Sequence, residues 1–71
     1  MEDERAEILQ SLARHPGWGL VVAEIDRRLR MDFAALKTEE TLENVRKLQG
    51  RIAELEALRD WPLQESRRLS K

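Results

Sequence analysis

The sequence predicts an all-α fold: an antiparallel helical hairpin of coiled-coil character, with a short N-terminal helix packed on it. Apolar residues recur every three or four positions through most of the chain, which is the spacing of one helix face and not of a strand. Prolines are only two, so the chain divides into a few long segments. A length of 71 residues allows one domain, covering 1–71.

The first helix is predicted over residues 3–14. Acidic residues gather in its first turn, where the helix dipole favours them. The residue before a proline is pushed out of the helical region, so we expect this helix to end before His15. We expect His15 to cap its C-terminus, where a cation is favoured. The apolar face of this helix consists of Ile8, Leu9 and Leu12.

The second helix is predicted over 17–36, opened by Pro16, whose fixed φ suits a first helical turn. Its apolar positions are Trp18, Val21, Val22, Ile25, Leu29, Phe33 and Leu36. We expect the chain to reverse near Leu36–Thr41, with Thr38 as the N-cap of the next helix. No glycine or proline forces a turn there, so one continuous rod of two helices stays open as an alternative.

The third helix is predicted over 39–60, with residues 62–71 as a basic tail or a short terminal helix. Its apolar positions are Leu42, Val45, Leu48, Ile52, Leu55 and Leu58. Gly50 lies inside it, either as a tolerated interior glycine or as a point where another helix comes close.

A reversal near residue 39 sets the pairing between the second and third helices. Ile25 would lie near Ile52, and Trp18 opposite Asp60–Trp61, so that the two tryptophans close the open end. The candidate packing and interface residues are Trp18, Val21, Ile25, Leu29, Phe33, Val45, Leu48, Ile52, Leu55 and Trp61.

The composition of the chain argues against several classes of function. The chain has no cysteine and one histidine, so we expect no disulfide, no metal site and no cofactor. The 13 basic and 14 acidic residues nearly balance, whereas nucleic-acid-binding domains usually carry a basic excess. The longest apolar run is Leu20–Ala23, far short of the ~20 residues that cross a bilayer. An acidic N-terminus is unlike a secretory signal, and we expect a cytoplasmic protein.

We expect no enzyme, no catalytic residue and no small-molecule substrate. His15 is the only side chain that ordinarily titrates near neutrality, and it is assigned a structural role. The acidic residues are interpreted as solubilising charges on solvent-facing helix surfaces. One local basic cluster remains as a candidate contact for phosphate or an acidic partner: Arg27, Arg28 and Arg30.

The second helix has more apolar residues than one face can hold. They include Leu20, Val21, Ala23, Met31, Ala34 and Ala35. A two-helix hairpin covers one face of each helix, so we expect this helix to contact more than the third helix. A second protomer, giving a four-helix arrangement, is one way to cover the rest.

Two short motifs add a resemblance. They are His15-Pro16-Gly17-Trp18 after the Leu9–Leu12 turn, and Leu48-Gln49-Gly50-Arg51-Ile52 before Leu55 and Leu58. With this pattern, residues 8–62 resemble short helical phage and prophage proteins encoded among head and neck assembly genes. The resemblance implies a virion-assembly accessory or minor structural protein, in the host cytoplasm or in the virion, near the portal or connector. It implies no functional residues.

The sequence therefore favours a non-enzymatic helical interaction module whose partner is a second copy or a larger phage structural protein such as a portal. The alternative is a small nucleic-acid-binding or regulatory protein that uses the three-arginine cluster and the basic C-terminal tail.

Overall fold

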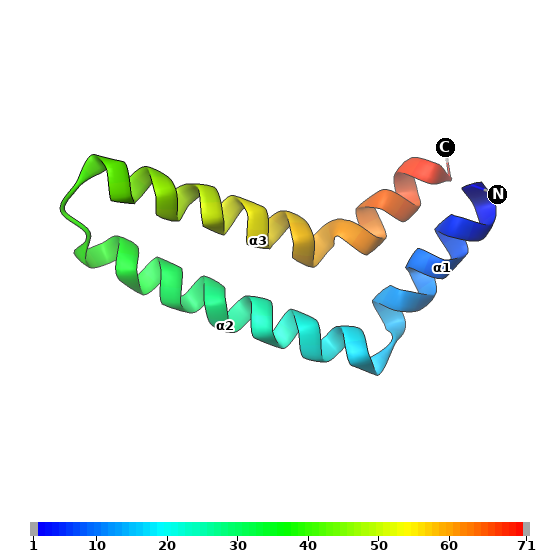
Figure 1. The fold of residues 1–71 in the computed structure, drawn as a ribbon. Coiled ribbons are helices and arrows are strands. Elements are labelled where there is room, and N and C mark those ends of the chain that lie inside the picture. Colours follow the sequence, from blue (N-terminus) through cyan, green and yellow to red (C-terminus); the bar gives the residue numbers. More distant parts are fainter. Residues whose placement is uncertain (1, 71) are drawn as a thin grey trace.

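A computed structural model describes residues 2–70, which form three helices: α1 (Glu2–Arg14), α2 (Pro16–Thr38) and α3 (Leu42–Leu69). These residues include no strand, which confirms the all-helical fold class. α2 and α3 lie side by side, and α1 lies beside the C-terminal part of α3, so that the first and last described turns meet at one end of the molecule (Figure 1).

His15 is the N-cap of α2. The prediction that it caps the C-terminus of α1 is wrong. Its backbone is extended (φ −71°, ψ 136°), and its Nδ1 accepts a hydrogen bond from the Gly17 N–H at 2.9 Å. This is the geometry of an N-cap, because it satisfies one of the free N–H groups of the first helical turn. A Cβ on Gly17 would lie 3.0 Å from that Nδ1, so glycine leaves the room that the cap needs.

The chain leaves the helical conformation at residues 39–41, where α2 ends and α3 has not begun. The Oε1 atom of Glu39 accepts hydrogen bonds from the backbone N–H groups of Glu40 and Thr41 and from the side chains of Thr41 and Asn44, at 3.1–3.3 Å. The Thr41 N–H, followed by the Asn44 amide, lowers the pKa of Glu39. One carboxylate therefore organises a connection that contains no glycine or proline.

Two sequence interpretations of this connection are wrong. The N-cap of α3 is Thr41, whose hydroxyl accepts from the Asn44 N–H at 3.3 Å. Thr38 is the last residue of α2, and its hydroxyl donates back to the Ala35 carbonyl. The continuous rod is excluded as well, since Glu39 and Thr41 are extended and α2 packs against α3.

α3 does not stop at Asp60, as predicted, but continues through Pro62 to Leu69. A proline inside a helix removes one backbone hydrogen bond and pushes against the carbonyl four residues earlier, which bends the helix. α3 bends where its ribbon passes from yellow to orange, and the segment after the bend follows α1 (Figure 1). Pro62 is almost completely buried, so its packing helps to offset the lost hydrogen bond.

The buried apolar side chains form two small clusters. Between α2 and α3, Ile25 and Leu29 pack with Ile52, with Leu36 and Leu55 partly buried against them. At the other end, the cluster of Ala6, Leu9 and Leu69 joins α1 to α3. Ser66, 1% exposed, donates its hydroxyl to the Ala6 carbonyl at 3.2 Å between these helices.

The helices lie in one layer. Figure 1 shows all three next to one another, with none covering another, and the molecule measures 48 × 25 × 12 Å. A second layer at the usual separation of helix axes would need a depth of about 13 Å or more. Both broad faces of the layer are therefore uncovered.

Candidate protein interaction surface

An apolar surface crosses from α2 to α3 on one face of the layer. A hollow of 390 Å³ is lined mainly by Leu20, Val21, Ile25, Leu55 and Leu58. It adjoins a shallower hollow of Ala57, Leu58 and Trp61. We call the apolar side chains that form this face the Leu58 surface: the exposed Leu20, Val21, Leu58 and Trp61 and the partly buried Leu55.

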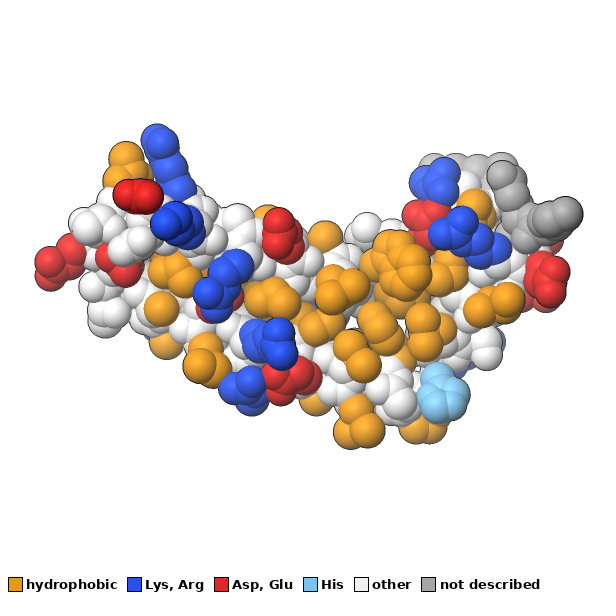
Figure 2. All heavy atoms as spheres, in the orientation of Figure 1, with side chains coloured by type: hydrophobic (Ala, Val, Ile, Leu, Met, Phe, Trp, Pro, Cys, Tyr) orange, Lys and Arg blue, Asp and Glu red, His pale blue; other side chains and the backbone are white. Residues whose placement is uncertain are grey.

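The side chains of the Leu58 surface are unusually open to solvent for their size. Leu20 is 76% exposed, Leu58 is 49% exposed and Trp61 is 40% exposed. Figure 2 shows hydrophobic side chains gathered over α2 and α3 towards the end of the molecule where α1 lies. Leu58 lines three adjoining hollows, which places it at the centre of the surface.

Charged residues border the Leu58 surface on the side towards the 39–41 connection. Glu24 and Arg28 line its main hollow, while Arg51 and Glu54 line the adjoining one with Arg28. Both signs of charge are therefore present along one edge. An apolar centre with a charged edge is the usual anatomy of a protein–protein contact.

Glu24 forms ion pairs with two of the three arginines of the predicted phosphate cluster. Its carboxylate accepts from Arg27 at 2.7 and 2.8 Å and from Arg28 at 2.9 Å. Hydrogen bonds from Arg27, then from Arg28, lower the pKa of Glu24 to about 2. Arg30 is exposed and takes no part in this group. The structure thus does not bring the three guanidinium groups together around an open anion site.

Asp32 is a buried carboxylate that the sequence analysis placed among the solvent-facing charges. It is 2% exposed, and its Oδ1 accepts from Arg51 Nη2 at 2.6 Å across the two helices. Its Oδ2 is also buried and has no hydrogen-bond partner among residues 2–70. The signal was available in the sequence, because Asp32 lies three and seven residues after the core positions Leu29 and Ile25 and so shares their helix face.

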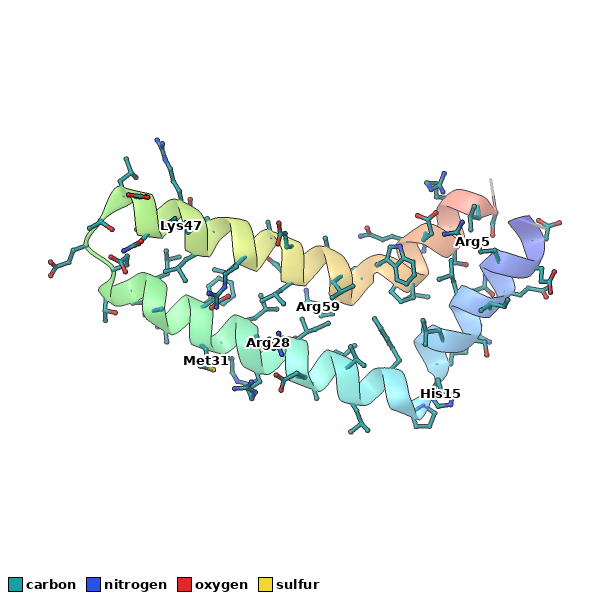
Figure 3. All side chains as sticks on the ribbon, in the orientation of Figure 1. Arg5, His15, Arg28, Met31, Lys47 and Arg59 are labelled. Carbon is teal, nitrogen blue, oxygen red and sulfur yellow. The ribbon has the colours of Figure 1, made fainter. Side chains whose placement is uncertain are left out.

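A second ion pair joins α2 to α3 nearer the open end. Arg59 Nη1 lies 3.3 Å from the Asp26 carboxylate, and its Nε lies 3.4 Å from Asp60. Asp26, followed by Asp60, raises the pKa of Arg59. The stick view labels Arg59 on α3 where it faces α2 (Figure 3). From Asp26 to Asp32 the residue numbers rise along α2, while the numbers of their partners fall along α3, from Arg59 to Arg51. The two pairs together hold the helices in this alignment.

The two tryptophans do not close the open end together. Trp18 lines a cleft of 470 Å³ with Ala13, Val22, Pro62 and Leu63, where the three helices meet. Trp61 is not part of this lining and lies on the Leu58 surface instead. Pro62 is buried on the inner side of α3, whereas the preceding Trp61 is 40% exposed.

The predicted packing residues divide between the interior and the surface. Ile25, Leu29 and Ile52 are buried. The partly buried ones are Trp18, Val45, Leu48 and Leu55. The exposed ones are Val21, Phe33 and Trp61. Leu58 was predicted as an apolar position of the third helix and Leu20 as a surplus apolar residue of the second, but neither was among the candidate interface residues. A stripe of apolar residues does not show which of its edges remains uncovered.

Gly50 is not a close-packing site within this chain. A Cβ placed on it would meet no atom within 4 Å. The structure therefore agrees with a tolerated interior glycine and contradicts a close approach by another helix of the same chain.

No group of three or more His, Cys, Asp and Glu side chains within residues 2–70 is placed to hold a metal ion. In the same part of the chain, no helix is long and apolar enough to cross a membrane. Comparison of the chain with models of protein families, with curated proteins and with solved structures gives no match in any of the three. The surface itself therefore carries the functional argument.

Proposed function

We propose that this chain is a non-enzymatic helical protein–protein interaction module that binds its partner through the Leu58 surface. The observation that carries the proposal is the continuity of exposed Leu20, Leu58 and Trp61 across two helices. Soluble monomers rarely leave a large contiguous apolar patch in water, and such patches mark sites of interaction.

The composition of the surface supports the same function. Tryptophan and arginine are enriched among the residues that dominate binding energy at protein contacts. Trp61 supplies a broad apolar side chain on the surface, while Arg28 and Arg51 stand at its edge. Burial of the leucines and the tryptophan would provide the free energy of binding, and the edge charges would select the partner.

The rigid platform for this surface is, in this proposal, an antiparallel hairpin of α2 and α3 with coiled-coil-like packing. The reversed order of the Asp26–Arg59 and Asp32–Arg51 pairs supports it, as does the shared core of Ile25, Leu29 and Ile52. A platform built on helices holds binding residues more firmly than a loop does.

We place the module in phage particle assembly, in the host cytoplasm and in contact with itself or a larger structural protein such as a portal. This setting rests on the motif resemblance in residues 8–62. Its test is the set of genes next to the coding sequence: head, portal or terminase genes would support the setting, and a cluster of unrelated metabolic genes would contradict it.

The nucleic-acid-binding alternative depends on Arg27, Arg28, Arg30 and the basic end of the chain. The ion pairs of Glu24 with Arg27 and Arg28 favour the interaction module, since a phosphate would have to compete with a carboxylate already in place. Binding of DNA or RNA at low salt, weakening linearly in a log–log salt plot, would revive the alternative.

Photo-crosslinking tests the interaction surface directly. A benzophenone amino acid replaces Leu58 in one variant and the exposed Leu42, outside the surface, in a control variant. We expect irradiation of host cells to join position 58 to a protein in much higher yield than position 42. Equal yields at the two positions would overturn the proposal.

A further inference from the structure

We propose that the partner on the Leu58 surface is a second copy of this chain, docked face to face around a twofold axis near Leu58. The dimer would be a two-layer helical bundle. This inference rests on the proposed function, because it names the occupant of the same surface.

The exposed area of the chain is the first argument. A compact folded protein of 8.3 kDa exposes about 4,600 Å². This chain exposes 5697 Å², an excess of about 1,100 Å² over that scaling. A stable protein–protein contact buries about 800 Å² on each partner. The surface left open by one copy is thus enough to form a complete dimer interface.

The layer architecture is the second argument. Stable domains consist of two or three packed layers around a core, whereas the three helices here form one layer. Within residues 2–70, the buried hydrophobic side chains form two separate clusters of three residues each. The chain has no cysteine, and residues 2–70 hold no group of side chains placed to bind a metal. A chain of this size then usually needs another staple, and association of copies is a common one. A second layer from an identical chain would join the Leu58 surfaces into a new core.

The position of Leu58 and the edge charges fit a symmetric contact. In a twofold dimer one patch meets itself, so its central residue lies near its own copy. Leu58 occupies that centre, since three adjoining hollows share it. Along the edge, Arg28 and Arg51 stand beside Glu24 and Glu54. An edge with both signs of charge can be self-complementary, which an edge of one sign cannot.

The mass of the purified protein in sedimentation equilibrium tests the inference. We expect twice 8.3 kDa at concentrations in the tens of micromolar. The Leu58→Glu variant should dissociate at least about 30-fold more readily, because a charge would enter the centre of the contact. The Leu42→Glu variant, changed at a leucine that is also exposed but lies outside the surface, should remain a dimer. A folded wild-type monomer, or a trimer or higher closed ring, would overturn the inference.

A disulfide between two copies of the chain provides a second test, which holds even if Leu58→Glu does not fold. The chain contains no cysteine, so Leu58→Cys introduces a single thiol. A twofold axis near residue 58 brings two such thiols within disulfide distance, and mild oxidation should give a covalent dimer in high yield, whereas Leu42→Cys should stay largely monomeric. Equal yields would contradict the placement of the axis.

The crosslinking experiment separates the failure of this inference from the failure of the proposed function. An adduct of position 58 with its own chain supports both. An adduct only with a different protein keeps the interaction surface and rejects self-docking. The absence of any adduct above the position 42 control rejects both.

Discussion

Asp32 of α2 and Arg51 of α3 form an ion pair of 2.6 Å in which the carboxylate is almost fully buried and the guanidinium is mostly in water. The pair lies beside the apolar contact of Leu29 with Ile52. Burial of a carboxylate is costly unless hydrogen bonds and an opposite charge compensate it. The pair ties Asp32 of α2 to Arg51 of α3, and we expect it to favour this alignment of the two helices at some expense of stability.

Loss of the arginine of this pair should lower the stability of the fold more than loss of the aspartate. Arg51→Ala leaves Asp32 buried without a partner, and we expect the free energy of unfolding to fall by about 1–3 kcal/mol. Asp32→Leu removes the buried charge and its unpaired oxygen, and should be neutral or stabilising. Urea unfolding at one protein concentration measures both. Arg46→Ala, at an exposed arginine of the same helix, is the control and should change little.

The cap of α3 gives a prediction that separates two neighbouring threonines. Thr41→Ala removes the hydroxyl that accepts from the Asn44 N–H, and should lower stability by about 0.5–2 kcal/mol. Thr38→Ala removes only a hydroxyl that donates back to the Ala35 carbonyl, and should have a smaller effect. Thermal unfolding followed by circular dichroism makes the comparison. A larger loss at Thr38 would mean that the cap is misplaced.

Two glycines should respond to alanine in opposite directions. Gly50→Ala places a methyl group in open space on a helix, and we expect stabilisation of about 0.5–1 kcal/mol. Gly17→Ala brings a Cβ within 3.0 Å of the capping His15 Nδ1, which should disturb the corner and lower stability. Chemical unfolding of the two variants tests the contrast. Destabilisation by Gly50→Ala would indicate a neighbour at Gly50 that a single chain does not supply.

Glu24 should make stability depend on pH in the acidic range. Its pKa falls from 4.5 to about 2 on folding, chiefly through hydrogen bonds from Arg27 and then Arg28. A lowered folded-state pKa means that the contribution is complete above pH 4.5 and is lost as the pH falls through about 2. The wild type should therefore melt at a higher temperature than Glu24→Gln above pH 4.5, and this difference should shrink as the pH falls towards about 2. A difference that is constant with pH would show that the ion pairs do not form in solution.

The helices themselves could be read from the sequence because apolar spacing reports a helix face directly. The first helix and the core residues Ile25, Leu29 and Ile52 follow from that spacing, and the break at His15 follows from Pro16. The capping residues could not be predicted from apolar spacing. Thr38 and Thr41 are equally good caps by type, and only the hydrogen bonds of Glu39 place the connection after residue 38.

The errors at Pro62 and Asp32 have one physical origin. A proline usually ends a helix and an aspartate usually faces water, but both residues here lie against another helix. Tertiary packing overrides the local preference in each case, and a single sequence does not state which positions are packed. For the same reason, the sequence indicated surplus apolar residues on 17–36 but could not locate Leu20 and Leu58 on one surface.

The concentration dependence of thermal unfolding tests most directly whether the Leu58 surface is covered by a second chain. Folding coupled to dimerisation makes the melting temperature rise with protein concentration. Between about 5 µM and about 200 µM we expect a rise of about 5 °C or more for the wild type, and no rise for Leu58→Glu. A wild-type melting temperature that is the same at both concentrations, and equal to that of Leu58→Glu, would contradict the account.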